Sequence, residues 1–328
     1  MNFLEPTRNL ALELVRVTEA AALAAARFMG RGDKIAADKA SVDAMRLVLN
    51  TIEMDGVIVI GEGEKDEAPM LFNGEKVGSG DHPKVDIAVD PIDGTRPLAL
   101  GIHGSIATVA IAPRGTMFNP GPFVYMNKIA VGPEACDVID IDIPVKENLR
   151  RVAKAKHKEV EDLTVVILDR PRHQELISEV RQAGARISLI PDGDVNGALM
   201  TAWPNSGIDV LLGIGGTPEG VLAACCLRAM GGNIQGKLYA RNEDEIRRGE
   251  EMGYDFHKVL TMEDLVSSED VFFAATGITS GDLLKGVLYT ADRARTDSLV
   301  VRGLTGTVRQ ISAMHRLDKL DRISRIHY

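Results

Sequence analysis

Acidic residues and glycines follow three short apolar runs that resemble β-strands. These runs are GVIVIGEGE (residues 56–64), VDIAVDPIDGT (85–95) and IDVLLGIGGTPEG (208–220), and their acids include Glu62, Asp90, Asp93 and Glu219. Carboxylates crowded into one pocket repel one another, so such a cluster is typical of a divalent-cation site. With cations between them, the acids could bind a phosphate ester that they would otherwise repel. The sequence therefore predicts Mg²⁺ or Mn²⁺ and a phosphorylated small molecule.

The string DPIDGT places two of these acids within one predicted turn. We expect Asp90 at the end of its strand, where Pro91 interrupts the hydrogen-bond ladder. The turn would then return Asp93 beside Asp90, with Gly94 allowing a tight approach. Asp-Pro and Asp-Gly turns are frequent in any protein, but Thr95 completes a less common six-residue string. We predict that the two aspartates share a cation.

Two glycine-rich turns supply the other acids. In GEGE, flanking glycines allow positive φ and could aim Glu62 or Glu64 inward, and Glu62 is favoured because it lies closer to the strand. The turn GIGGTPEG opens a helix whose free N–H groups form an anion cradle. With Thr217 as the expected N-cap, Glu219 occupies the second helical position, where a favourable interaction with the helix dipole is the alternative to metal binding.

Three strands in the second half of the chain should run parallel, so the loops at their carboxyl ends should meet. Those loops are LDRPRH (168–173), IPDGD (190–194) and GIGGTPEG. Arg170 and Arg172 would bind a second phosphate, and Asp192 and Asp194 would accept hydrogen bonds from sugar hydroxyls. Each loop alone resembles an ordinary turn or a pair of solvated arginines, so their convergence carries the interpretation.

Other candidate residues have plainer structural explanations. Asp38 precedes a helix expected from about Ser41 to Glu53, and sequence physics alone favours helix capping for it. Tyr125 could lie over a sugar or pack in the core. The histidines, His173 among them, show no metal-binding spacing and are expected to be surface or packing residues.

The spacing of apolar residues changes near the middle of the chain. A helical pattern at residues 10–28 and alternating strands and turns at 85–131 predict an α+β half with a mainly antiparallel sheet. From residue 163 onward strands and helices alternate, as in a parallel sheet with crossover helices. We therefore expect an α+β metal-binding domain at 1–160 and an α/β domain with the substrate loops at 161–328.

Composition excludes several classes of protein. The 328 residues carry 47 acidic against 38 basic side chains, with no basic run interleaved with aromatics, so nucleic acid is not an expected partner. No apolar run reaches the ~18 residues of a membrane span, and the N-terminus lacks a signal-peptide pattern. The three cysteines fit neither a disulfide framework nor a zinc site. We expect a cytoplasmic protein with no membrane partner.

These strings together resemble the class II, GlpX-type fructose-1,6-bisphosphatases of bacteria across nearly the whole chain. The matching strings, in order, are RVTEAAALAA, GRGDKIAAD, GVIVIGEGEKDEAPML, VDIAVDPIDGT, RPRH, IPDGDV, GIGGTPEGV and FFAATGITSGDLL. The family is similar to the metal-dependent, lithium-sensitive phosphatases. The resemblance implies their α/β sugar phosphatase fold, a layered αβαβα sandwich with cations at the DPIDGT turn.

The resemblance also implies roles for individual residues. Metal or catalytic positions are implied at Asp38, Glu62, Asp90, Asp93 and Glu219, which replaces the capping interpretation of Asp38. Substrate contacts are implied at Gly94, Thr95, Tyr125, Arg170, Arg172, Asp192, Asp194 and Gly216. Some family members have glutamate where Asp93 stands, and lysine often stands where Arg170 does, which keeps the charge but alters the geometry.

The expected activity is hydrolysis of the 1-phosphate of fructose 1,6-bisphosphate, in gluconeogenesis, by a homo-oligomer that is a dimer or tetramer. Cations held by the acids would clamp the ester while water attacks in line, with Thr95 activating or orienting the water and the two arginines holding the 6-phosphate. The alternatives are a phosphatase that also accepts sedoheptulose 1,7-bisphosphate, an inositol-phosphate type phosphatase, and a non-catalytic sugar-phosphate sensor. The pair Arg170 and Arg172 argues against a monophosphate substrate.

Overall fold

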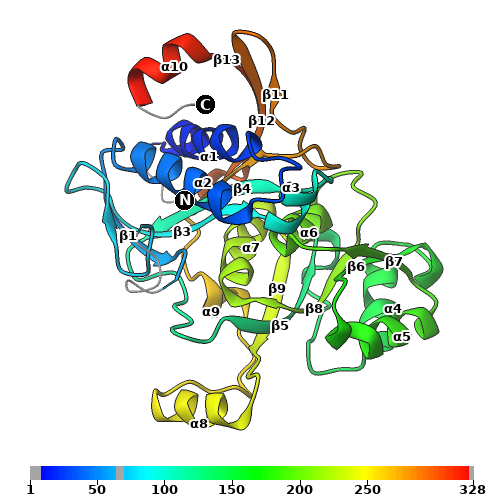
Figure 1. Ribbon diagram of the computed structural model, residues 1–328. Helices are drawn as coiled ribbons and strands as arrows, with labels where there is room; N and C mark the ends of the chain where they lie inside the picture. The colour runs from blue at the N-terminus through cyan, green and yellow to red at the C-terminus, as the bar shows by residue number, and fades with distance from the viewer. Residues whose placement is uncertain (1–8, 64–69, 325–328) are drawn as a thin grey trace.

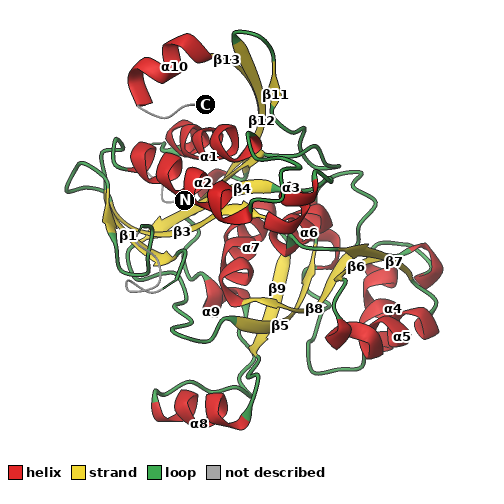
Figure 2. Ribbon diagram, in the orientation of Figure 1, coloured by secondary structure: helices red, strands yellow, loops and turns green. Residues whose placement is uncertain are grey.

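The computed structural model describes residues 9–63 and 70–324, which form alternating layers of helix and sheet (Figures 1 and 2). Helices α1 (Ala11–Ala26) and α2 (Lys34–Leu49) share a buried core with the first sheet. Helices α6 (Asp194–Ala202) and α7 (Thr217–Met230) share a second core with both sheets. Helices α4 (Val145–Ala155) and α5 (Gln174–Ala183) cover the other face of the second sheet. The expected αβαβα sandwich is confirmed.

The first sheet combines one parallel pair of strands with antiparallel pairs. Its order among the described residues is β11-β12-β10-β4-β3-β1-β2, with β13 paired to β12, and only β1 and β3 run parallel. The strands are β1 (Asp55–Ile60), β2 (Lys76–Val77), β3 (Lys84–Asp93), β4 (Ile106–Pro113), β10 (Phe272–Gly277), β11 (Leu288–Tyr289), β12 (Arg293–Arg302) and β13 (Thr307–Arg316). The expectation of a mainly antiparallel sheet holds for this sheet.

The second sheet has the order β7-β6-β8-β5-β9. Strands β6, β7 and β8 are parallel, as the alternation of strands and helices predicts, whereas β5 runs antiparallel to both of its neighbours, β8 and β9. The strands are β5 (Tyr125–Val131), β6 (Thr164–Leu168), β7 (Arg186–Ile190), β8 (Val210–Gly216) and β9 (Asn233–Leu238).

Strand pairing crosses the expected domain boundary near residue 160. Strand β5 precedes that residue but lies inside the second sheet, and β10, β12 and β13 follow it but belong to the first. The two sheets therefore do not divide at residue 160, and the division into two domains stays a prediction. Each sheet combines strands from both halves of the chain because strands far apart in the sequence pair with one another. The local spacing of apolar residues does not reveal such pairing.

Short helices connect these layers. Helix α3 begins at the end of β3, η3 leads from β6 into α5, and α8 projects from the body of the molecule (Figure 1). They are α3 (Thr95–Leu100), α8 (Glu243–Glu251), α9 (Met262–Leu265), α10 (Leu317–Ser324), η1 (Pro133–Ala135), η2 (Val160–Asp162), η3 (Pro171–His173) and η4 (Gly303–Thr305). No helix in the described part of the chain has the length and apolar character needed to cross a bilayer.

Two helix starts differ from expectation. Helix α2 begins at Lys34 rather than Ser41, because the side chain of Asp33 accepts a hydrogen bond from the Ala36 N–H and caps it. Asp38 therefore lies inside α2, and its capping interpretation is wrong. Helix α7 has Gly216, not Thr217, as its N-cap, which moves Glu219 to the third helical position.

Candidate functional site

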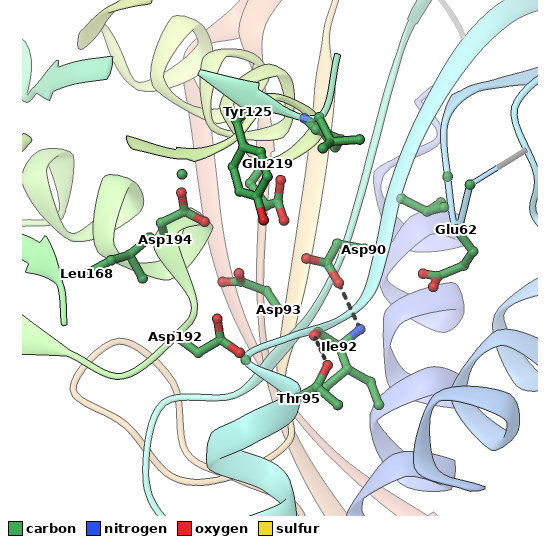
Figure 3. Close-up of a pocket in the computed structure, with 18 of the residues that line it drawn as sticks. Glu62, Asp90, Ile92, Asp93, Thr95, Tyr125, Leu168, Asp192, Asp194 and Glu219 are labelled. Carbon is green, nitrogen blue, oxygen red and sulfur yellow. Dashed lines mark hydrogen bonds between the residues drawn. The ribbon is translucent and has the colours of Figure 1, made fainter. Parts of the chain in front are cut away.

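A cavity of about 500 Å³ lies between the two sheets, where loops from both converge (Figure 3). Its lining unites residues that are far apart in the sequence. Of the residues singled out for chemistry, it is lined by Glu62, Asp90, Asp93, Gly94, Thr95, Tyr125, Arg170, Arg172, Asp192, Asp194, Gly216 and Glu219. Asp38 lines a smaller adjoining cavity of about 80 Å³, together with Glu62 and Asp90. Glu64 lies outside the described residues.

An irregularity in strand β3 turns Asp90 and Asp93 toward the same cavity. The strand does not end at Asp90, as expected, but continues to Asp93. Asp90 lies opposite Thr108 of β4 and Asp93 opposite Ile106, so three steps along β3 match two along β4. In a regular strand, residues three apart face opposite sides of the sheet, and one extra residue restores a common side. Figure 3 shows both carboxylates facing the open space.

Few hydrogen bonds compensate the burial of these two aspartates. Asp90 accepts the Ile92 N–H at 3.0 Å, and Asp93 accepts the Asn196 N–H, at the start of α6, at 2.9 Å. Burial raises the pKa of Asp90 well above its ordinary range, and the charge of Asp93 adds to the shift. Burial likewise raises the pKa of Asp93, assisted by the charge of Asp194. In this pocket the ionised forms of both aspartates are therefore disfavoured relative to their protonated, neutral forms.

A second group of acids faces Asp90 from α2 and the end of β1. Glu62 is exposed as a whole residue, but loss of hydration at its carboxylate raises its pKa to about 7, and the charges of Asp38 and Glu219 contribute. The Thr95 hydroxyl, at the first position of α3, lies 3.5 Å from Oδ1 of Asp38 and 3.3 Å from the Ile92 carbonyl. Asp38 thus reaches the site from the interior of helix α2, whose N-cap is Asp33.

Glu219 enters the cavity from the first turn of α7. Its side chain folds over Gly216, where an added Cβ would lie only 1.6 Å from Oε2 of Glu219. Burial raises the pKa of Glu219 to about 7, with the charge of Asp194 raising it further and that of Lys128 lowering it. Its Oε2 atom is buried and has no hydrogen-bond partner among the described residues. That oxygen is available to a ligand.

Lys128 is a site residue that the sequence interpretation missed. It lies on β5, 2% exposed, with Nζ 2.7 Å from Oδ2 of Asp194 and 2.7 Å from the Gly216 carbonyl. The sequence held one signal, because Lys128 alternates with Met126 and Ala130 on a face of the strand that is buried. Asp194 is therefore neutralised inside the protein.

The segment between β6 and α5 brings two arginines to the cavity lining. Arg170 forms an ion pair with Asp192 at 3.1 Å and donates to the Pro191 carbonyl at 2.5 Å. Arg172 donates from Nε and Nη2 to the Ile214 carbonyl, at 3.2 and 2.8 Å. Its guanidinium lies 5.4 Å from the ring centre of Tyr125, the first residue of β5. The cavity lining thus combines a cluster of acids with two arginines, one of which is paired with Asp192.

The donor set fits a hard divalent cation. The acids that line the two cavities offer only oxygen atoms, which Mg²⁺ and Mn²⁺ prefer, and the buried Oε2 of Glu219, which has no hydrogen-bond partner among the described residues, is free to bind such an ion. As the side chains are oriented, no three acidic, histidine or cysteine residues in the described ranges come together to hold one ion. For three or more of these acids to hold one ion, their carboxylates would have to rotate.

Comparisons with known proteins agree along nearly the whole chain. Residues 8–315 match the family model described as bacterial fructose-1,6-bisphosphatase, glpX-encoded. The chain is 48% identical to fructose-1,6-bisphosphatase 1 class 2 of Escherichia coli K12, over 98% of this chain and 99% of the relative. The class 2 enzymes of Escherichia coli O6:H1 and Shigella flexneri match with the same identity and coverage.

Proposed function

The chain belongs to the bacterial, glpX-encoded fructose-1,6-bisphosphatase family, and from this premise we propose how its pocket works. The protein is a phosphoric monoester hydrolase that converts fructose 1,6-bisphosphate to fructose 6-phosphate and phosphate. The observation that carries the assignment of roles is that one cavity is lined both by a cluster of acids and by two arginines. In this proposal the acids lie at the reacting phosphate and the arginines at the far end of the substrate.

Asp38, Glu62, Asp90, Asp93 and Glu219 hold Mg²⁺ or Mn²⁺ in this proposal. The raised pKa values of these acids support it, because a cation offsets the repulsion that burial and neighbouring charges create. A divalent ion, when bound, supplies the charge that draws the ester into an acidic pocket and polarises its phosphoryl oxygens.

Arg170 and Arg172 bind the 6-phosphate. Both are anchored in the structure to backbone carbonyls, so their guanidinium groups are already held at the cavity wall. Preorganised cations lose less freedom on binding a phosphate than free side chains would. Tyr125 packs beside Arg172 and lies over the sugar, and Asp192 and Asp194 contact its hydroxyls. Backbone groups of Gly94 and Gly216 complete the contacts.

Thr95 orients the attacking water. Its hydroxyl can donate to Asp38, which leaves the hydroxyl oxygen free to accept a hydrogen bond from a water molecule in the cavity. The water then attacks the phosphorus in line with the leaving sugar oxygen. Positioning and charge neutralisation carry most of phosphoryl transfer, so little covalent chemistry falls to the protein.

A phosphate-release assay over several substrates tests this function. We expect turnover of fructose 1,6-bisphosphate with Mg²⁺ or Mn²⁺, inhibition by lithium, and weak turnover of inositol 1-phosphate, which offers no second phosphate to the arginines. Equal efficiency with inositol 1-phosphate would contradict the roles of Arg170 and Arg172. Binding of bisphosphate without phosphate release under every cation would indicate a sensor instead.

We also propose a cytoplasmic location, a role in gluconeogenesis and a homodimer or homotetramer. These three statements rest on the family resemblance. Sedimentation of the purified protein tests the last of them, and a monomer over the working concentration range would contradict it.

A further inference from the structure

His173 occupies an unusual place between two strands. It is 2% exposed, at the end of η3, and both ring nitrogens meet backbone groups. Nδ1 lies 2.7 Å from the Leu168 carbonyl, and Nε2 lies 2.8 Å from the Ile214 nitrogen. A carbonyl can only accept, so Nδ1 carries the proton and Nε2 accepts the Ile214 N–H. The imidazole is therefore neutral and held in one tautomer.

The ring bridges β6 and β8 beyond the point where their direct pairing stops. The two strands pair through Val165 with Val210 and Val166 with Leu211. His173 joins Leu168 to residue 214, beyond that pairing. Gly213, with φ of +120°, leaves room for the ring, since an added Cβ there would lie 3.0 Å from Nε2. The imidazole replaces backbone pairing where the strands separate around the cavity.

Arg172 depends on the same peptide segment. The Ile214 N–H donates to His173, and the Ile214 carbonyl accepts both hydrogen bonds from Arg172. The position of Ile214 thus fixes where the guanidinium of Arg172 stands at the cavity wall. Any shift of this residue toward β6 would carry its carbonyl, and with it the arginine, out of place.

We propose that His173 is a positioning residue for the bisphosphate, acting through Ile214 on Arg172 without contacting the substrate. The proposal rests on the function argued above, in which Arg172 binds the 6-phosphate. If His173 only filled space, its volume would matter but its two hydrogen bonds would not. The bond to Ile214 is the one that matters for substrate affinity, and the bond to Leu168 only orients the ring.

Two matched variants separate these bonds. In H173Q the Oε1 atom stands near the position of Nε2 and can accept from Ile214, whereas in H173N the Nδ2 group stands near Nδ1 and can donate only to Leu168. For H173N we expect KM for fructose 1,6-bisphosphate, with Mn²⁺, to rise about tenfold, since misplacement of a binding group costs up to ~100-fold. The value of kcat should stay within about twofold, because uniform binding is lost.

The variant H173Q should restore most of the affinity, and R172Q serves as the reference. A KM in H173N equal to that of the wild type, when R172Q raises KM, would overturn the role of His173. An unchanged KM in R172Q would instead contradict the function assigned to Arg172. A similar KM rise in H173Q and H173N would reduce His173 to packing.

The tautomer provides a check on the unmodified protein that needs no variant. Nitrogen-15 spectra of the histidine-labelled enzyme should show His173 neutral with its proton on Nδ1. A proton on Nε2 would exclude acceptance from Ile214 and overturn the proposal even if the variants did not fold.

Discussion

The ammonium group of Lys128 and the carboxylate of Asp194 form an ion pair of 2.7 Å in which the side chains are only 2% and 8% exposed. Lys128 also donates to the Gly216 carbonyl, at the N-cap of α7, and its charge lowers the pKa of the neighbouring Glu219. One buried cation thus connects β5, α6 and α7 behind the cavity. Lys128 thus acts both on a proposed substrate residue, Asp194, and on a proposed metal residue, Glu219.

Removing the charge of Lys128 should destabilise the protein. The substitution Lys128→Met leaves the Asp194 carboxylate buried without its partner, which typically costs about 3–5 kcal/mol of unfolding free energy. Denaturant unfolding measures the loss. The exposed pair of Lys39 and Asp43 is the control, and Lys39→Met should cost about 0–1 kcal/mol. Equal losses of unfolding free energy in the two variants would show that the buried ion pair stabilises the protein no more than the exposed pair does.

A methyl group at Gly216 should displace Glu219. In Gly216→Ala the added carbon would overlap Oε2 of Glu219, so that side chain must leave its position. We expect weaker cation binding by calorimetry and slower turnover, with thermal stability little changed. The matched control is Gly281→Ala, where the added carbon meets nothing nearer than 3.4 Å. Unaltered cation affinity in Gly216→Ala would remove Glu219 from the proposed ligands.

The cation-free protein should lose stability as pH rises. Glu62 and Glu219 each have a pKa near 7 in the folded protein, against an ordinary value of 4.5. Between these values the folded state binds more protons than the unfolded state, so unfolding free energy falls with increasing pH. The loss should develop from about pH 4.5 to about pH 7 and then level off.

Thermal melting in the presence of a chelator measures this slope, and Glu62→Gln should reduce it by removing one titrating group. Added Mn²⁺ should raise the melting temperature more at pH 8 than at pH 5, because cations compete with protons for the carboxylates. Rising stability across the same pH interval without cation would contradict the raised pKa values.

The Thr95 hydroxyl should affect turnover more than binding. In Thr95→Val the shape is kept while the hydrogen bond to Asp38 is lost. If the hydroxyl orients the attacking water, kcat should fall about 100-fold, as for positioned proton-transfer groups, with little change in KM. Thr95→Ser should retain most activity. Equal activity of the Ser and Val variants would exclude a role for the hydroxyl.

Local patterns predicted most of the cavity wall, because strand ends, glycines and acids are visible in the sequence. The convergence of LDRPRH, IPDGD and GIGGTPEG followed from the parallel order of β6, β7 and β8. The start of α2 was misplaced because Asp33 and Asp38 both precede apolar helical positions, and only the fold shows which of them caps.

Features that depend on distant pairing could not be predicted from the sequence. The burial of Lys128 follows from the insertion of β5 between β8 and β9, a strand order that its alternation with Met126 and Ala130 does not reveal. The bulge that aligns Asp90 with Asp93 depends on the register with β4. His173 looked like a packing residue because its two partners, Leu168 and Ile214, lie on different strands.

The central claim is that the acids clustered at the cavity make catalysis depend on bound cations. The most direct measurement is phosphate release from fructose 1,6-bisphosphate by chelator-treated protein before and after Mn²⁺ is added, for the wild type and Asp90→Asn. The exposed acid Asp43 of α2 provides the control variant Asp43→Asn. We predict cation-dependent release by the wild type and the control, and none by folded Asp90→Asn at any Mn²⁺ concentration. Near-wild-type release by Asp90→Asn would contradict the account.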